Sequence, residues 1–206
     1  MLVMTKIKAV VFDLWETIGT KNISVSKTLQ KHFDLTPTHD FLQKYERAIQ
    51  LKKWDRQEDA AKSLLAEFDV ELSPSNIDFA VNLLSNSINQ ATMFEGMKEL
   101  LVELQQKYKL GMLSNTTNFE SVVLTNWGVA HLFTSMVFSW EIGTIKPSAN
   151  NFKVICDKLN LPPHEILFVD DGIVNVEAAK SFGMRGVVFT GVDDLNEYLD
   201  KLFSGQ

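Results

Sequence analysis

The sequence predicts an α/β fold in which helices cover both faces of a mostly parallel sheet, with an all-helical unit inserted after the first strand. Three observations lead to this prediction. Short apolar runs typical of buried strands recur along the chain, segments with helical periodicity separate them, and one long stretch near the N-terminus is helical throughout. Because strands that alternate with helices form βαβ units, a mostly parallel sheet follows.

Five apolar runs are the predicted strands. The first, residues 7–12 ("IKAVVF"), is short, continuous and rich in β-branched residues, as a strand buried on both faces is. The others lie at residues 110–114, 136–139, 165–170 and 186–190. Helical patterns accompany them at residues 96–108, 119–128, 148–160, 174–183 and 193–203, and several end in Gly or Asn, which commonly terminate helices. This order predicts a Rossmann-like core.

One region interrupts the alternation of strands and helices. From about residue 18 to residue 92 the sequence contains amphipathic helical patterns at residues 42–54, 58–68 and 76–88, with no convincing strand. Turns that carry Pro and Ser separate these helices. We therefore expect an α/β core formed by residues 1–17 and 93–206, and a helical cap formed by residues 18–92.

Composition and charge exclude several classes of partner. The chain has 206 residues, a net charge of −6 and no basic run, which disfavours nucleic-acid binding. It contains no apolar run approaching the roughly 20 residues of a membrane span, and no signal-peptide pattern. A single cysteine, Cys156, is typical of a reducing compartment, so we expect a cytoplasmic protein. The sequence is compatible with a monomer or a homodimer.

Polar residues gather at the carboxyl ends of the predicted strands, the edge of a parallel sheet where ligands bind. Each has an ordinary structural explanation, such as a turn or a helix cap. Their agreement at four neighbouring strand ends is much harder to explain by chance. The residues are Asp13, Ser114, Asn115, Lys146, Asp170, Asp171 and Asn175.

The chain resembles the haloacid dehalogenase (HAD) superfamily of hydrolases, specifically its phosphatases with a small helical (C1) cap. Four motifs carry the resemblance in the order of the superfamily. They are "VVFDLWET", "LGMLSNTTN", "FSWEIGTIKP" and "EILFVDDGIVNVEAAKSFGM". The predicted helical insertion also stands where this superfamily carries its cap.

The resemblance implies a role for each matched residue. Asp13 matches the nucleophile and Lys146 the catalytic lysine. Ser114, with Asn115 and Lys146, matches the phosphate-binding site. The metal ligands would be Asp13, Asp171 and the backbone carbonyl of Trp15, with Asp170, Asn175 and Thr17 in support.

The charges of these residues favour the same conclusion. Asp13, Asp170 and Asp171, brought together in a partly dry site, would repel one another strongly, and Lys146 supplies a single positive charge. A hard divalent cation resolves this imbalance, and Mg²⁺ suits a few carboxylates together with phosphate oxygens. We therefore expect Mg²⁺ as the cofactor and a small phosphorylated molecule as the substrate, attacked by Asp13 to give an aspartyl-phosphate.

Trp15 is the departure from the family pattern. Phosphatases of this superfamily usually carry a second aspartate at this position, which protonates the leaving oxygen and later activates water. Such acid–base help is worth about 10²- to 10⁴-fold in rate. Glu16 is the nearest candidate substitute, although an adjacent residue is expected to point elsewhere. Arg47 on the predicted cap helix is a candidate ligand for a carboxylate or halide, although a solvent-exposed helix face explains the same charge.

Three functions are therefore compatible with the motifs. The first is a Mg²⁺-dependent phosphatase that is slowed or altered by the absence of the second aspartate. The second is a catalytically impaired module that binds phosphate or a protein. The third is a metal-independent 2-haloacid dehalogenase, because those relatives carry an aromatic residue at the position of Trp15. Against the third, Asp170–Asp171 is the metal-binding form of the fourth motif.

Overall fold

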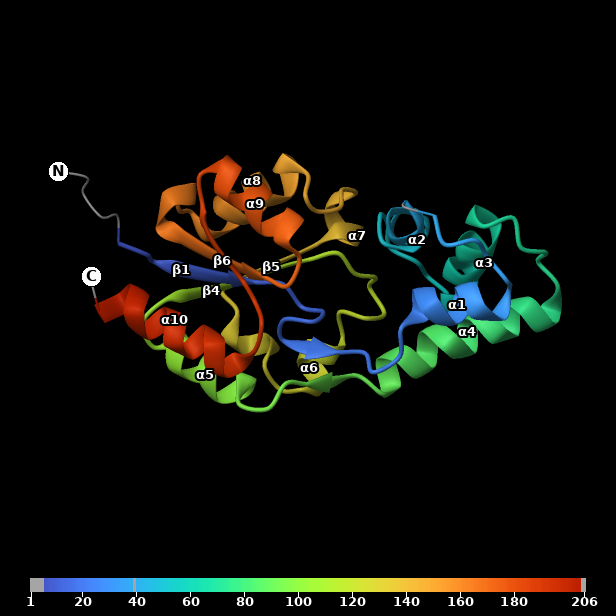
Figure 1. The fold of residues 1–206 in the computed structure, drawn as a ribbon, viewed down its shortest axis with the longest axis horizontal. Helices are drawn as coiled ribbons and strands as arrows, with labels where there is room; N and C mark the ends of the chain where they lie inside the picture. Colours follow the sequence, from blue (N-terminus) through green and yellow to red (C-terminus); the bar gives the residue numbers. More distant parts are fainter. Residues whose placement is uncertain (1–5, 39, 205–206) are drawn as a thin grey trace.

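The computed structural model describes residues 6–38 and 40–204, and its architecture is the α/β fold that the sequence predicts (Figure 1). Five parallel strands form one sheet in the order β5-β4-β1-β6-β7. The strands are β1 (Ala9–Phe12), β4 (Lys109–Ser114), β5 (Ser135–Phe138), β6 (Ile166–Asp170) and β7 (Arg185–Val188). The central strand β1 pairs with β4 on one side and with β6 on the other.

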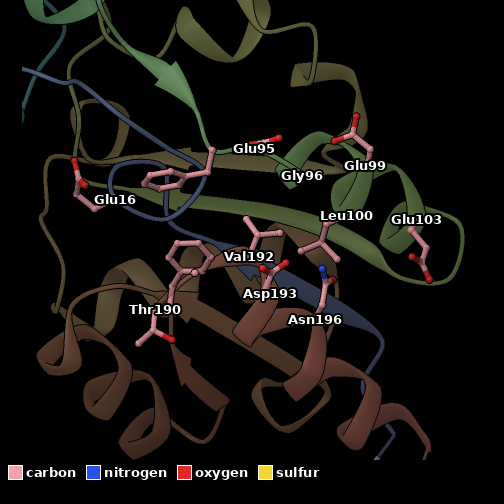
Figure 2. A pocket seen from close by; sticks show the side chains of 13 residues that line it. Glu16, Glu95, Gly96, Glu99, Leu100, Glu103, Thr190, Val192, Asp193 and Asn196 are labelled. Carbon is pink, nitrogen blue, oxygen red and sulfur yellow. The ribbon is translucent and has the colours of Figure 1, made fainter.

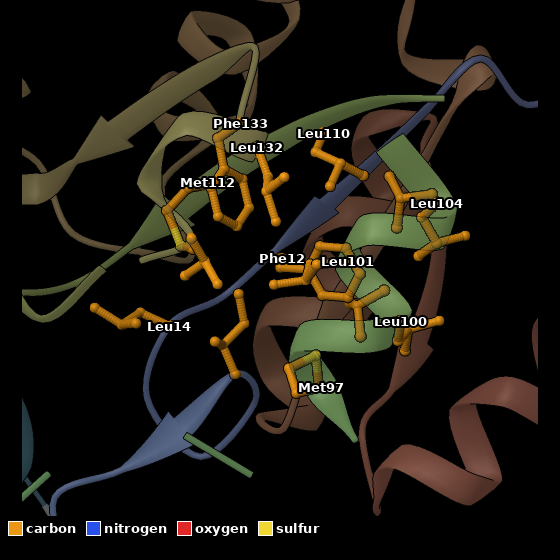
Figure 3. Close-up of a cluster of buried hydrophobic side chains, with 14 of the residues drawn as sticks. Phe12, Leu14, Met97, Leu100, Leu101, Leu104, Leu110, Met112, Leu132 and Phe133 are labelled. Carbon is orange, nitrogen blue, oxygen red and sulfur yellow. The ribbon is translucent and has the colours of Figure 1, made fainter. Parts of the chain in front are cut away.

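Alternation along β1 directs side chains to two separate hydrophobic clusters. Val10 and Phe12 belong to a cluster that includes residues of α5 (Met97–Gln105) and α10 (Val192–Ser204), part of which Figure 3 shows. Ala9 and Val11 belong to the cluster on the opposite face, with residues of α8 (Ala149–Leu159) and α9 (Ile173–Phe182). Both faces of the sheet are therefore covered by helices, which explains why its strands are apolar without a polar alternation.

A separate group of helices lies beyond the carboxyl end of the sheet (Figure 1). Its members are α1 (Val25–His32), α2 (Phe41–Ile49), α3 (Gln57–Glu67) and α4 (Pro74–Asn89), which share a hydrophobic cluster of their own. Within the described residues, no helix has both the length and the apolar character needed to cross a lipid bilayer.

Two very short strands join this helical group to the sheet, and the sequence did not indicate them. β2 (Gly19–Thr20) pairs antiparallel with β3 (Thr92–Met93), at the two ends of the stretch that we expected to contain no strand. Two-residue strands are too short to show an alternating pattern. The absence of a side chain at Gly19 permits the pairing, because an added Cβ would lie 2.4 Å from the Thr92 carbonyl oxygen.

Other boundaries differ from the sequence expectation in ways that have local causes. The third predicted strand ends at Phe138 because Ser139 begins a short helix, α7 (Ser139–Ile142). The predicted helix at residues 119–128 shrinks to α6 (Val123–Asn126). Its first turn is replaced by side-chain hydrogen bonds, in which Glu120 accepts from the backbone N–H of Thr117 and Thr117 Oγ1 accepts from the N–H of Glu120.

Candidate active site

The carboxyl ends of three adjacent strands bring the sequence-predicted residues together. Asp13 follows β1, Ser114 ends β4 and Asp170 ends β6, and β1 lies between the other two strands. The backbone N–H of Asp13 donates to the carbonyl of Val169 at 2.9 Å, which continues the β1–β6 pairing to the edge of the sheet. All three side chains are buried.

Lys146 bridges two of the carboxylates. Its Nζ lies 2.8 Å from Asp13 Oδ1 and 2.5 Å from Asp170 Oδ2, and the side chain is buried. Burial alone favours the neutral amine, but Asp13 and Asp170 outweigh it and raise the pKa of Lys146 above its usual value. Burial raises the pKa of Asp13 to about 7, with Asp170 acting in the same direction and Lys146 opposing it.

The two consecutive aspartates have different surroundings. Asp170 accepts three hydrogen bonds: its Oδ1 accepts from the N–H of Gly172 at 2.8 Å and from Asn175 Nδ2 at 2.9 Å, while Oδ2 accepts from Lys146. Asp171 is exposed and lines a cleft. Its pKa is raised, mainly by partial burial of the carboxyl group and by the charge of Asp170. Its backbone N–H donates to Oγ1 of buried Thr17 at 3.2 Å, which ties the first motif to the fourth.

Ser114 and Asn115 complete the site from β4. The buried Ser114 hydroxyl has no well-formed hydrogen bond to any described residue, although it adjoins the Asp13 carboxylate. A buried polar group without a partner is uncommon and often marks a ligand site. Asn115 has a positioning role, since its Oδ1 accepts from the backbone N–H of Lys146 at 2.7 Å.

The donor set fits a divalent cation. Carboxylate oxygens of Asp13, Asp170 and Asp171 lie within 4.8 Å of one another. Lys146 neutralises a single unit of their charge, and hard oxygen ligands are those that Mg²⁺ prefers. Because Asp170 already accepts from Gly172, Asn175 and Lys146, Asp13 and Asp171 are the residues best placed to hold a metal.

Trp15 turns its indole toward a neighbouring loop. Nε1 donates to Thr116 Oγ1 at 3.2 Å, and the ring meets Trp127 edge to face with 6.3 Å between centroids. Thr116 in turn donates to Glu120, whose buried carboxylate pairs with Lys21. Lys21 Nζ also lies 4.7 Å from the centroid of the Trp15 ring. This network connects the first motif to the base of the helical group.

A cleft with a volume of about 610 Å³ opens between the strand ends and the helical group. Its core side includes Asp13, Trp15, Asn115, Lys146 and Asp171, whereas Lys21 lines it from the connection to the helices. From α2 come Tyr45 and Glu46, followed by Gln50 at the end of the helix.

The two further candidates from the sequence have different positions. Arg47 is exposed and is absent from the described lining of the cleft. Glu16 lies at the rim, where its Oε1 accepts from Thr20 Oγ1 at 2.8 Å, and its φ angle of 56° places it in the left-handed region. Its side chain therefore faces the β2–β3 connection.

A second hollow, of about 800 Å³, borders the cleft at Glu16 (Figure 2). It runs between the beginnings of α5 and α10, with Glu16 at one end and Glu103 at the other. Its described lining carries five carboxylates, namely Glu16, Glu95, Glu99, Glu103 and Asp193, and no lysine or arginine. The larger hollow is therefore a poor site for a phosphate, in contrast to the cleft that holds Lys146.

Two residues of α2 that line the cleft, Tyr45 and Glu46, were missed from the sequence. The signal that could have found them is helical spacing, because Glu46 and Gln50 are four residues apart and adjoin the buried Tyr45 and Ile49. The pairing of Lys21 with Glu120 had no sequence signal, since 99 residues separate the two.

Comparison with known sequences places the chain in a family. A family model described as haloacid dehalogenase-like hydrolase matches residues 7–183. A phosphoglycolate phosphatase of Mannheimia succiniciproducens is 30% identical over 136 residues, which cover 65% of this chain and 59% of that protein. A second one, from Haemophilus influenzae, is 29% identical over 62% of this chain and 57% of its own length. The chain thus spans less than two thirds of these curated relatives.

Solved structures share the fold at low sequence identity. A HAD family enzyme from Bacteroides thetaiotaomicron, an aspartate-to-alanine mutant in complex with magnesium and inorganic phosphate, has a TM-score of 0.66 and 21% identity, covering 93% of this chain and 98% of that one. Together with the match of the family model to most of the sequence, this similarity confirms the resemblance seen in the motifs: the chain belongs to the haloacid dehalogenase-like hydrolase family.

Proposed function

We propose that this chain is a Mg²⁺-dependent phosphatase of small phosphorylated metabolites that forms a covalent aspartyl-phosphate on Asp13. The observation that carries the proposal is Lys146, a buried cation between Asp13 and Asp170, with the Ser114 hydroxyl, which has no well-formed hydrogen bond within the described residues, beside the Asp13 carboxylate. This combination offers a nucleophile and two donors for phosphate oxygens at a single point. The phosphoglycolate phosphatases similar to this chain support the same reaction class.

In the first step, a carboxylate oxygen of Asp13 attacks phosphorus while the bond from phosphorus to the leaving oxygen breaks. The electron pair of that bond departs with the leaving oxygen, which takes up a proton. Lys146 and Ser114 donate hydrogen bonds to the phosphoryl oxygens, where negative charge must be balanced as the carboxylate approaches. Lys146 contributes as a point charge already held in place by Asp170.

In the second step, water attacks phosphorus and the bond to Asp13 breaks, which returns the carboxylate and releases inorganic phosphate. Asn115 holds the backbone of Lys146, and Thr17 holds the backbone of Asp171, so both positions are fixed before substrate arrives. Asp13, Asp171 and the Trp15 backbone carbonyl would hold Mg²⁺. When bound, Mg²⁺ neutralises phosphate charge and permits an anionic nucleophile to approach.

The helical group is proposed to act as a cap, with residues 18–92 as the cap and residues 1–17 and 93–206 as the core; residues 1–5, 39, 205 and 206 lie outside the described residues. The β2–β3 pair stands at the proposed boundary. A cleft of about 610 Å³ suits a small metabolite. A cytoplasmic location, supported by the single cysteine, is likewise a proposal.

The position of Trp15 favours an enzyme over an impaired binding module. Its indole bonds to Thr116 and packs against Trp127, so it forms a wall of the cleft and leaves open space next to Asp13. The dehalogenase alternative has a structural neighbour, an L-2-haloacid dehalogenase of Xanthobacter autotrophicus with chloropropionic acid covalently bound (TM-score 0.62, 21% identity, 97% and 84% coverage). At 21% identity, that likeness shows a shared fold and no shared reaction. The Asp171 carboxylate, which lies close to those of Asp13 and Asp170, favours the metal-dependent phosphatase.

A panel of phosphorylated metabolites, assayed with Mg²⁺ and with a chelator, tests the proposal. We expect phosphate release that requires Mg²⁺ from a small group of substrates, with phosphoglycolate among the first to be tried. Release of chloride from chloropropionate, unaffected by chelator, would instead establish a dehalogenase. Binding of Mg²⁺ and phosphate without turnover of any compound would establish a binding module.

A further inference from the structure

A phosphatase with tryptophan at position 15 needs another source for the proton on the leaving oxygen. Trp15 Nε1 is already bonded to Thr116, and an indole N–H is far too weak an acid to transfer its proton. The inference below rests on the proposed phosphatase reaction and identifies the group that supplies this proton.

The geometry of the reaction limits where that group can lie. The attacking and leaving oxygens are roughly in line through phosphorus. Asp13 attacks from the end of β1, so the leaving oxygen lies on the side of phosphorus that faces away from the sheet edge. The helices of the cap lie beyond that edge (Figure 1). The acid is therefore to be sought on the cap side of the cleft.

Glu46 is a carboxylic acid on that side. It belongs to α2 and lines the same cleft as Asp13 and Asp171. Its Oε1 accepts a hydrogen bond from Asn115 Nδ2 at 3.4 Å, and Asn115 also holds the backbone of Lys146. A cap residue is thus tethered to the loop that follows Ser114, where the phosphoryl group would bind.

The surroundings of Glu46 shift its pKa in the direction that a general acid requires. Burial raises its pKa above the usual glutamic acid value, and the charge of Asp170 acts in the same direction. The hydrogen bond from Asn115 and the charges of Lys146 and Lys21 oppose this rise without cancelling it. Lys21 is itself paired with Glu120, which limits its effect. A general acid must carry its proton near the working pH, and the upward shift of the Glu46 pKa acts in that direction.

We propose that Glu46 is the general acid and base of this enzyme, replacing the aspartate absent at position 15. In the first step its carboxyl proton passes to the leaving oxygen as the phosphorus–oxygen bond breaks, which yields the free alcohol and the Glu46 carboxylate. In the second step that carboxylate takes a proton from the attacking water, while the electron pair of the phosphorus–Asp13 bond returns to Asp13. Glu46 is then protonated again and the cycle is balanced.

Glu16, the candidate nearest to Asp13 in sequence, is less suitable. Its carboxylate accepts a hydrogen bond from Thr20 in the β2–β3 connection, and its side chain is exposed at the boundary with the second hollow. It lies at the rim of the cleft, whereas Glu46 comes from the helix that faces the strand ends.

The test compares leaving groups in the Mg²⁺-loaded enzyme. In Glu46→Gln we expect kcat/KM for an alkyl phosphate, such as glycerol phosphate, to fall by about 10²- to 10⁴-fold. For para-nitrophenyl phosphate, whose leaving group needs little protonation, we expect a change of no more than a few fold. The decline of the alkyl-phosphate rate at high pH, where Glu46 loses its proton, should disappear in the variant.

Two matched variants make the result specific. Glu67→Gln removes an exposed carboxylate from α3 of the same cap and should leave both rates unchanged. Glu16→Gln tests the competing acid and should not produce the leaving-group dependence. Retention of the wild-type melting temperature and of inorganic phosphate binding would exclude misfolding of Glu46→Gln.

Different failures have different meanings. An equal loss of kcat/KM on both substrates, or no loss on either, would overturn the role of Glu46 while the proposed phosphatase function stands. A selective loss in Glu16→Gln would also overturn it and assign the acid to Glu16. If wild-type protein with Mg²⁺ hydrolyses neither substrate nor any member of the metabolite panel, the proposed function itself fails, and the inference fails with it.

Discussion

The ammonium group of Lys146 lies 2.5 Å from Asp170 Oδ2, and both side chains are fully buried at the edge of the sheet. The same nitrogen lies 2.8 Å from Asp13 Oδ1, so one cation is shared by two carboxylates. A buried charge that loses its partner is strongly unfavourable, since water cannot replace the missing interaction. The stability of the core and the proposed chemistry therefore depend on the same side chain.

Replacement of Lys146 by methionine should lower the free energy of unfolding of the metal-free protein by about 3–5 kcal/mol above neutral pH. Urea denaturation monitored by circular dichroism measures this change. The loss should be smaller in mild acid, because Asp13 is then protonated. Lys153→Met, which removes an exposed lysine paired with Asp157, is the matched control and should leave stability unchanged. Equal effects of the two substitutions would contradict the bridging role of Lys146.

The raised pKa of Asp13 predicts how stability depends on pH. Between its ordinary value of 3.8 and about 7, the folded protein holds a proton on Asp13 that the unfolded chain releases. The contribution of Asp13 to stability is therefore fully present below that window and is lost as pH rises through it.

Mg²⁺ should counteract this loss, because it binds the ionised carboxylate. We expect Mg²⁺ to raise the melting temperature more at about pH 8 than at about pH 5, and we expect Asp13→Asn to remove most of the difference. Thermal unfolding by calorimetry at the two pH values, with Mg²⁺ and with chelator, measures it. An equal shift at both values would be inconsistent with Asp13 as a metal ligand.

Trp15→Asp restores the acid that family phosphatases usually carry and should increase the rate on alkyl phosphates. The substitution also removes the contacts with Thr116 and Trp127, so a loss of about 1–3 kcal/mol in stability should accompany it. Trp15→Phe, which keeps a ring and adds no acid, should show no gain. Steady-state kinetics on glycerol phosphate measures the change, and a folded Trp15→Asp without a gain would contradict the expectation that the absence of this aspartate slows the wild-type enzyme.

If Glu46 supplies the proton in the wild-type enzyme, Trp15→Asp should also recover part of the activity that Glu46→Gln loses. The double variant should therefore have a higher kcat/KM than Glu46→Gln alone for an alkyl phosphate, and nearly the same kcat/KM for para-nitrophenyl phosphate. If the effects of Trp15→Asp and Glu46→Gln on kcat/KM simply multiply in the double variant for both substrates, the two positions do not share a role.

Gly19→Ala should destabilise the connection between the helices and the core. An added Cβ would lie 2.4 Å from the Thr92 carbonyl oxygen, a backbone atom of the paired strand, and 2.6 Å from Trp127 Cη2. Such overpacking typically reduces stability by about 1–3 kcal/mol. Denaturant unfolding measures the change, and Ser75→Ala, at an exposed position in the first turn of α4, is a suitable control. An unchanged midpoint in Gly19→Ala would show that the β2–β3 pair tolerates separation.

The sequence predicted the features that depend on local pattern. Apolar runs marked the five strands, and the polar residues that follow them, such as Asp13 and Asp170, were expected at one edge because parallel strands end together. The features that depend on tertiary packing could not be predicted from the sequence. On α2, the sequence offered Arg47 as a candidate ligand beside the explanation of a solvent-exposed charge; Arg47 is exposed, and Glu46 lines the cleft. The burial of Lys21 depends on Glu120, which belongs to a distant segment.

The most direct test of the proposed chemistry is the rate of para-nitrophenyl phosphate hydrolysis by the wild-type protein and by Asp13→Asn, each with Mg²⁺. The substituted amide would preserve the shape of the side chain but could not attack phosphorus. We expect Mg²⁺-dependent turnover by the wild type and none by the variant. Undiminished turnover by Asp13→Asn, or turnover by the wild type that persists in chelator, would contradict the assignment of Asp13 as the nucleophile of a magnesium-dependent phosphatase.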